Sequence, residues 1–257
     1  MLYLGIDQTG AVSTSGGPKP LPVCALHRNE LHFLYLPSLQ RSELEAILGP
    51  LIPRKTRIIL DCVLGLPSTV PLSLRQAIVA SQNTEGYGRK VAAEFFQSIR
   101  TNPLEELPRR KVEVLAKANS VFQERPFQKN IQTGTFRLWK ELGMDSTWYR
   151  FPHLCEETLS KKIPIFEGYP SYSWKYLFQT KHRTPESFPS LLKKYFPKLQ
   201  LDKGSQKLIC KDPNLIDAAV LAIHASILPK RSFSPPKKFR VIAPQEGWIL
   251  GFPFENS

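Results

Sequence analysis

Apolar and polar positions at the start of the chain alternate with the period of a β-strand. Leu2, Leu4 and Ile6 occupy one set of alternate positions between Met1 and Gly10. A period of two is typical of a strand, and the glycine after it favours a chain break. We therefore predict a buried central strand that ends at the carboxylate of Asp7.

Further strands and helices follow from the same reading of the pattern. Apolar runs predict strands over 22–27, 31–36, 57–63, 162–169 and 246–251, the last at a sheet edge, and Arg28-Asn29-Glu30 predicts a hairpin turn between the first two. Helical spacing predicts helices over 42–48, 172–178, 185–196 and 214–228. Ser42 and Glu45 have the spacing of a capping box, while Asp212 and Pro213 favour an N-cap and first helical position.

The middle of the chain differs from the rest, because its helical patterns are separated by proline-rich stretches. We expect helices over 76–82, 89–99 and 132–142, within a largely helical insertion that spans about 73–160. Segments 11–22 and 232–238 read as a mobile loop and a linker. The whole chain, 1–257, is therefore expected to be a single α/β domain that carries this insertion.

The composition is that of a protein with a packed core. Hydrophobic residues make up 42% of the chain, and no apolar run approaches the roughly 20 residues of a membrane span. Asp7 interrupts the N-terminus too early for a signal peptide. We therefore expect a soluble, cytoplasmic protein without a membrane partner, while its oligomeric state stays open. The four scattered cysteines indicate neither a zinc site nor a disulfide framework.

The charge of the chain indicates which class of partner it binds. Lys and Arg number 35 against 22 Asp and Glu, a formal net charge of +13. Such an excess favours a polyanionic partner, nucleic acid before a membrane surface, although a generally basic protein stays an alternative. The candidate phosphate contacts are Arg109, Arg110, Lys111, Lys161, Lys162, Lys181 and Arg183.

Acidic residues recur at the edges of apolar runs. Asp7, Asp61 and Glu167 each follow or end a predicted strand, whereas Asp217 shares a helix face with apolar residues. Burying a carboxylate is costly unless it is paired or binds a cation. Ion pairs with the surplus basic residues would explain each acid singly. Convergence of all four would instead require cations, and oxygen ligands without clustered His or Cys favour Mg²⁺ or Mn²⁺.

Five short motifs occur in an order that resembles a known family. They are Gly5-Ile-Asp7, Leu60-Asp-Cys-Val-Leu-Gly-Leu-Pro67, Phe166-Glu-Gly-Tyr-Pro170, Leu215-Ile-Asp-Ala218 and Glu246-Gly-Trp-Ile249. Their order is similar to that of the domain-of-unknown-function family 429, predicted nucleases related to RuvC-type resolvases. The resemblance implies an RNase H-like fold, with a mixed central sheet flanked by helices. It also implies a divalent-metal site at Asp7, Asp61, Glu167 and Asp217.

Two positions depart from the family pattern. Relatives tend to carry an Asp where this chain has Asn214, and often a Glu where it has Ser171. The amide oxygen of Asn214 can still ligate a metal, but it brings less charge, and Asp212 is an alternative ligand.

The sequence thus predicts a nuclease that cleaves DNA or RNA with two Mg²⁺ or Mn²⁺ ions about 4 Å apart. Its predicted catalytic residues are Asp7, Asp61, Glu167 and Asp217, with Asn214 as an added metal ligand. Two alternatives stay open. One is an RNase H-like nucleic-acid-binding protein with weakened catalysis, and the other is an actin-like or sugar-kinase-type ATP-binding protein, which the Asp7-Gln-Thr-Gly10 loop weakly favours.

Overall fold

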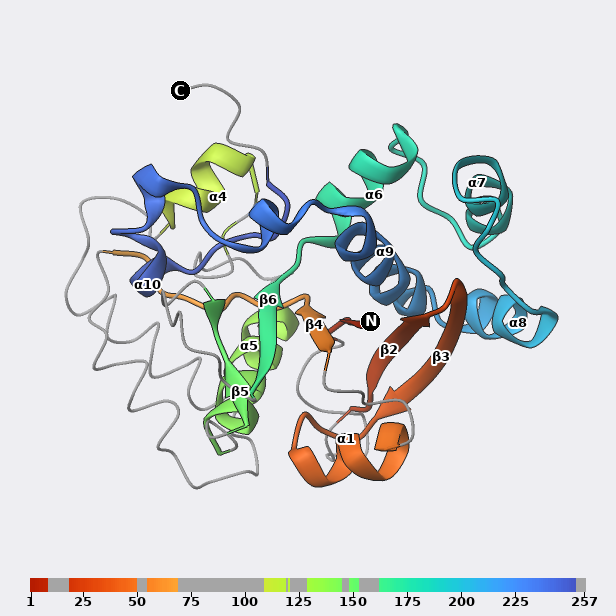
Figure 1. Ribbon diagram of the computed structural model, residues 1–257, viewed down its shortest axis with the longest axis horizontal. Helices are drawn as coiled ribbons and strands as arrows, with labels where there is room; N and C mark the ends of the chain where they lie inside the picture. Colours follow the sequence, from red (N-terminus) through yellow and green to blue (C-terminus); the bar gives the residue numbers. More distant parts are fainter. Residues whose placement is uncertain are drawn as a thin grey trace.

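A mixed sheet at the centre of the molecule is covered by helices on both faces (Figure 1). The computed structural model describes residues 1–8, 19–49, 55–68, 109–118, 120, 129–144, 148–152 and 162–252. The predicted helices over 76–82 and 89–99, and most of the predicted loop over 11–22, lie outside these ranges. In the described part of the chain, no helix is long and apolar enough to cross a membrane.

The sheet has six strands in the order β3-β2-β1-β4-β6-β5. Strands β1 (Leu2–Ile6), β2 (Leu21–His27) and β3 (Glu30–Leu36) are antiparallel neighbours. Strands β4 (Thr56–Leu60), β6 (Ile163–Glu167) and β5 (Tyr149–Arg150) run parallel to β1. The carboxyl ends of β1, β4 and β6 therefore meet at one edge of the sheet.

The predicted hairpin and central strands are confirmed, with β4 ending before Asp61. The predicted strand over 246–251 is wrong. Helix α10 (Ala243–Glu246) ends where that strand was expected to begin, and only Ile249 makes a bridge, beside Glu167. The short strand β5 was not predicted, because two residues carry no readable period.

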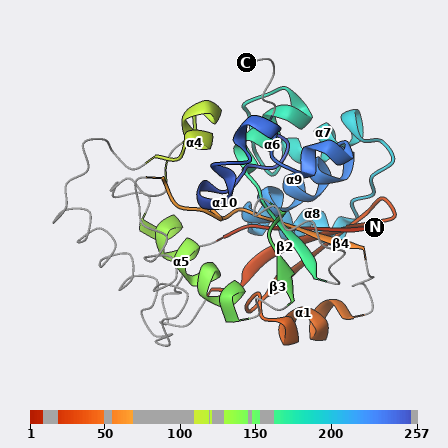
Figure 2. The ribbon, with the colours of Figure 1, turned by 60° about the vertical axis from the view of Figure 1, so that its left-hand side comes forward.

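Four helices cover one face of the sheet (Figure 2). They are α6 (Pro170–Phe178), α7 (Ser187–Tyr195), α8 (Lys203–Lys211) and α9 (Asn214–Ile227). Helix α9 packs against β1 and is almost wholly buried beyond its first turn. Helix α8 escaped prediction because it buries only Ser205 and Ile209, a stripe too short to show a helical period.

Two helices cover the other face, α1 (Arg41–Leu48) and α5 (Lys129–Met144) (Figure 2). Helix α5 confirms the helical pattern over 132–142, and its Phe136 and Trp139 are buried in the core. Helix α1 confirms the predicted helix but not the capping box. Its N-cap is Gln40, so that Ser42 lies inside the first turn.

Short elements gather beyond the carboxyl ends of β4 and β6. Helix α4 (Lys111–Ala116) lies within the predicted helical insertion but was not predicted itself, and 3₁₀ turns η4 (Lys230–Phe233) and η5 (Lys237–Phe239) overlap the predicted linker. Helix α4 lies near α10 in both views (Figures 1 and 2), because Glu246 accepts a hydrogen bond from the Lys111 amide at 2.6 Å. This cluster forms one wall of the cleft described next.

Candidate functional site

A cleft of about 430 Å³ lies at the edge where the parallel strands end. The parallel register delivers the residues that follow β1 and β4, and the last residue of β6, to this edge. The first turn of α9 adds two more side chains. The cleft is accordingly lined by all the acids predicted from the sequence and by the predicted amide ligand, namely Asp7, Asp61, Glu167, Asp217 and Asn214.

Asp7 and Asp61 are held side by side by the pairing of their strands. The Asp61 amide donates to the Ile6 carbonyl at 2.8 Å, which continues the β1–β4 ladder past the last strand residue. The two carboxyl groups interact directly, and the charge of Asp61 raises the pKa of Asp7. Because two carboxylates in contact repel each other, the protein favours one protonated acid in this pair when no cation is present.

Burial raises the pKa of both carboxyl groups in this pair. Asp7 is only 3% exposed, and burial and the neighbouring charges of Asp61 and Asp217 raise its pKa well above the usual range. Burial also raises the pKa of Asp61, to about 7. Without a cation, ionising both acids of this pair is costly. A divalent cation favours the charged forms, so the pair is suited to bind one.

Asp217 reaches the same cleft because α9 lies unusually close to β1. A Cβ atom on Gly5 would lie 1.9 Å from the Ala218 carbonyl oxygen, so only glycine permits this contact. Burial raises the pKa of Asp217 to about 6, although the guanidinium of Arg183 opposes the shift. Asn214 lies one turn earlier on the same helix and also lines the cleft.

Asp217 forms an ion pair with Arg183 in the cleft. Arg183 Nη1 lies 2.8 Å from Asp217 Oδ1. The geometry is not that of a hydrogen bond, so charge alone holds this buried oxygen. Mg²⁺ and Mn²⁺ prefer carboxylate and amide oxygens, and the aspartates and Asn214 supply both kinds in this cleft.

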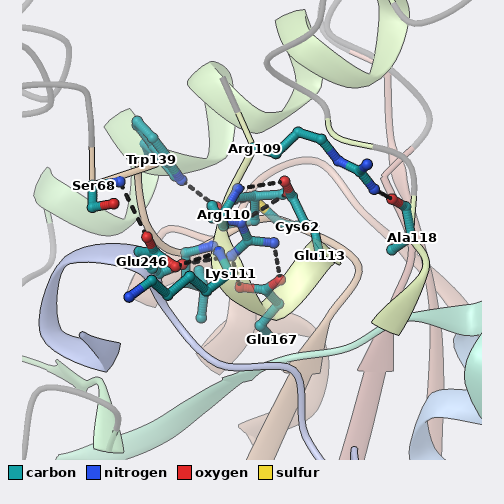
Figure 3. Close-up of polar contacts among 12 residues, drawn as sticks. Cys62, Ser68, Arg109, Arg110, Lys111, Glu113, Ala118, Trp139, Glu167 and Glu246 are labelled. Atoms are coloured by element: carbon teal, nitrogen blue, oxygen red, sulfur yellow. Dashed lines mark hydrogen bonds and ion pairs between the residues drawn. The ribbon is translucent and has the colours of Figure 1, made fainter. Parts of the chain in front are cut away.

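Glu167 differs from the three aspartates, because its carboxylate is already fully engaged by the protein. Arg110 donates from Nη2 to Glu167 Oε1 at 2.6 Å and from Nη1 to Oε2 at 2.8 Å (Figure 3). The Leu64 amide donates to Oε2 at 3.1 Å. Glu167 is 3% exposed and Arg110 is 1% exposed, so the ion pair is dry.

Arg110 also contacts two other elements of the cleft wall. Its Nε donates to Glu113 Oε1 at 2.8 Å, and its Nη1 donates to the Glu246 carbonyl at 2.7 Å. The neighbouring charges of Glu113 and Glu167 raise the pKa of Arg110 despite its burial, which opposes them. The guanidinium is therefore a permanent internal cation between two glutamates.

Two comparisons of this chain with known proteins were made by sequence. No model of a known protein family matches this chain, and no curated protein sequence matches it. The likeness to family 429 rests on the five short motifs alone. Among the described residues, moreover, no group of three or more His, Cys, Asp or Glu side chains is arranged as a ready metal centre.

The predicted phosphate contacts are divided between the surface and the interior. Lys111 and Lys181 are exposed, while Arg109 is exposed and donates to the Ala118 carbonyl at 2.9 Å. Arg183 lines the cleft, and Lys162 is half-buried. Arg110 is not on the surface with them, because its side chain turns inward to Glu167 and Glu113. Lys161 lies outside the described residues.

Several cleft residues were not anticipated from the sequence. Gln8, Tyr169 and Ser171 line the cleft, and burial raises the pKa of Tyr169. At the start of α4, Glu113 accepts hydrogen bonds from the Arg110 backbone amide at 3.0 Å and from its Nε at 2.8 Å, and the spacing of three residues between opposite charges was a usable signal. The long-range contact of Arg110 with Glu167 left no signal in the sequence.

His224 is packed inside the protein. It is 2% exposed, and its Nδ1 lies 2.9 Å from Ser173 Oγ. It lies two turns along α9 from Asp217 and does not line the cleft. Its position favours a packing role.

Proposed function

We propose that this protein is an RNase H-like nuclease that uses a divalent metal to hydrolyse phosphodiester bonds in DNA or RNA. The observation that carries the proposal is the convergence of Asp7, Asp61 and Asp217 in one cleft. Their raised pKa values support a cation site there. The mixed sheet flanked by helices agrees with the RNase H-like expectation at the level of architecture.

The aspartates and Asn214 would hold Mg²⁺ or Mn²⁺ through their oxygen atoms. Bound there, such a cation lowers the pKa of its water and stabilises charge on phosphate oxygens. Asp7 and Asp61 would lose their shared proton, since a cation favours both carboxylates. Arg183, already at the cleft, is placed to contact a phosphate oxygen, because its guanidinium is partly exposed beside its ion pair with Asp217.

Basic side chains around the cleft support a nucleic-acid substrate. Lys111 and Arg109 extend from the start of α4, and Lys181 lies two residues before Arg183. Exposed Lys and Arg contact phosphates without reading sequence, so these residues would position either DNA or RNA.

The second candidate is a nucleic-acid-binding protein whose catalysis is weakened. Two observations favour it: Asn214 occupies a position where relatives tend to carry Asp, and Glu167 is neutralised by Arg110. Such a protein would bind nucleic acid without needing the aspartates.

Cleavage assays separate the two candidates. The protein and its Asp7→Asn variant would be incubated with labelled single-stranded, duplex and branched DNA and RNA, with Mg²⁺, Mn²⁺ or EDTA. We expect cleavage that requires the metal and falls at least about 100-fold in the variant. The control is Glu186→Gln, an exposed acid on the segment before α7, which should cleave like the unaltered protein. Metal-independent binding without cleavage, unchanged in Asp7→Asn, would support the binding protein instead.

A further inference from the structure

Glu167 lies at a strand end beside the aspartates but differs from them in its charge balance. Asp7 and Asp61 face each other as two acids, and Asp217 has one partly exposed ion-pair contact, with Arg183. Glu167 instead accepts two short, parallel hydrogen bonds from a guanidinium and a third from a backbone amide. Its charge is already compensated inside the protein.

The Arg110 guanidinium beside Glu167 is fixed by hydrogen bonds to several partners. Arg110 is anchored by Glu113 and by the Glu246 carbonyl as well as by Glu167 (Figure 3). The Glu246 carboxylate in turn accepts from the amides of Lys111 at 2.6 Å and Ser68 at 3.2 Å, which ties α10 to α4. Because these partners come from separate elements, Arg110 cannot leave Glu167 without exposing or unpairing other buried polar groups.

We infer that Arg110 occupies the place of a second cation, so that Glu167 is not a metal ligand and the cleft holds a single divalent ion at Asp7, Asp61 and Asp217. A fixed guanidinium supplies the positive charge beside Glu167 that a second metal would otherwise bring. This inference rests on the proposed function, because it concerns the metal site of the same cleft. It departs from the two ions and four acidic ligands expected from the sequence.

Counting bound Mn²⁺ tests the inference without relying on activity. Free Mn²⁺ would be measured by electron paramagnetic resonance during titration of the unaltered protein, Glu167→Gln, Glu113→Gln and Asp61→Asn. Glu113→Gln is the matched control, because it removes one carboxylate from the same Arg110 cluster without altering an expected ligand. Either glutamine leaves Arg110 one ionised partner, and circular dichroism would check that each variant is folded.

We expect one Mn²⁺ per chain in the unaltered protein, and the same number with a dissociation constant within twofold in Glu167→Gln and Glu113→Gln. Asp61→Asn should bind at least tenfold more weakly. Two Mn²⁺ per chain, with one lost in Glu167→Gln but kept in Glu113→Gln, would overturn the inference and leave the metal-dependent nuclease standing. No specific Mn²⁺ binding by the unaltered protein would contradict the proposed metal site itself, and the inference with it.

A gain of binding separates this role of Arg110 from a purely structural one. The double variant Arg110→Met/Glu113→Gln removes the internal cation and its second partner, which leaves the Glu167 carboxylate uncompensated. If it folds, it should bind a second Mn²⁺, whereas a merely structural Arg110 predicts no added site. If it does not fold, the Glu167→Gln titration decides the question.

Discussion

At the scale of single residues, burial governs the protonation of the acids in the cleft. Asp7 and Asp61 are brought together by the β1–β4 pairing, away from bulk water, and this costs free energy whenever both are ionised. Burial also removes His224 from water, and its ring packs against Tyr172 and Tyr176. Both environments make stability depend on pH, with opposite signs.

Asp61→Asn is expected to stabilise the protein at pH 8 in EDTA. Burial raises the pKa of Asp61 from its ordinary 3.8 to about 7 in the folded state. Folding therefore favours the protonated acid, and this contribution is present at low pH and lost as the pH rises towards 7. Removing the acid should raise the free energy of unfolding at pH 8 by roughly 1–3 kcal/mol, and by much less at pH 4.5.

Urea denaturation of Asp61→Asn and of the Glu186→Gln control, at both pH values, provides the measurement. An equal effect at pH 4.5 and pH 8 would show that Asp61 is not a destabilising charge. Adding Mn²⁺ at pH 8 should reverse the order, because binding stabilises only the protein that keeps its ligands.

His224 should make the protein sensitive to acid. Burial lowers its pKa to about 4, so the neutral ring is the form that the folded state favours. Stability is then lost as the pH falls from about 6.5 to 4, because the unfolded chain takes up the proton first. His224→Gln should lose less stability over that range, as followed by urea denaturation at pH 6.5 and 4.5. A loss as large as in the unaltered protein would assign the acid sensitivity to other groups.

At the scale of elements, the approach of α9 to β1 determines whether Asp217 reaches the cleft. Gly5 makes that approach possible, and the pairing of β1 with β2 and β4 fixes the strand on both edges. Neither element can shift far, since residues of both are buried in the core.

Gly5→Ala is expected to destabilise the protein by at least about 2 kcal/mol, because its Cβ would meet the Ala218 carbonyl at 1.9 Å. Gly49→Ala is the matched control. Gly49 has a helical backbone conformation, and nothing lies within 4 Å of an added Cβ, so this change should be neutral or slightly stabilising. Thermal unfolding monitored by circular dichroism compares the two. Similar unfolding midpoints would argue against the close β1–α9 contact.

At the scale of the whole molecule, the net charge of +13 governs association with other molecules. The basic residues around the cleft are a small part of this excess, and others lie on α7, α8 and the 3₁₀ turns. A polyanion would therefore be attracted to much of the surface, while the cleft would select where it is cut.

Binding of labelled nucleic acid is expected to weaken steeply with salt, since phosphate contacts release counterions. The double variant Lys111→Gln/Lys181→Gln should reduce the slope of log K against log [salt] by about one to two units. Lys203→Gln/Lys207→Gln on α8 is the control and should change the slope less, because neither residue lies within two positions of a cleft-lining residue, as Lys111 and Lys181 do. Fluorescence anisotropy between 50 and 300 mM salt measures the slopes, and a flat response would argue against an electrostatic nucleic-acid partner.

The local pattern determined much of the architecture without help from tertiary contacts. Alternation up to Asp7, the Arg28-Asn29-Glu30 hairpin and the helical spacing after Asn214 each appear in the structure close to their predicted bounds. These features follow from backbone periodicity and turn chemistry, which neighbouring residues determine. The meeting of Asp7, Asp61 and Glu167 follows from strands that end at the same edge, whereas Asp217 joins them only through the packing of α9 on β1.

Only the tertiary structure decided the state of Glu167. The sequence around position 167 does not indicate that Arg110 is its partner. The free-energy cost of burying the Glu167 charge is offset by whichever opposite charge the fold brings near. The same holds for residues 246–251, where a strand-like pattern is turned into a helix end and a single bridge by packing against α4 and β6. Periodicity is local, whereas the compensation of buried charge is a property of the folded whole.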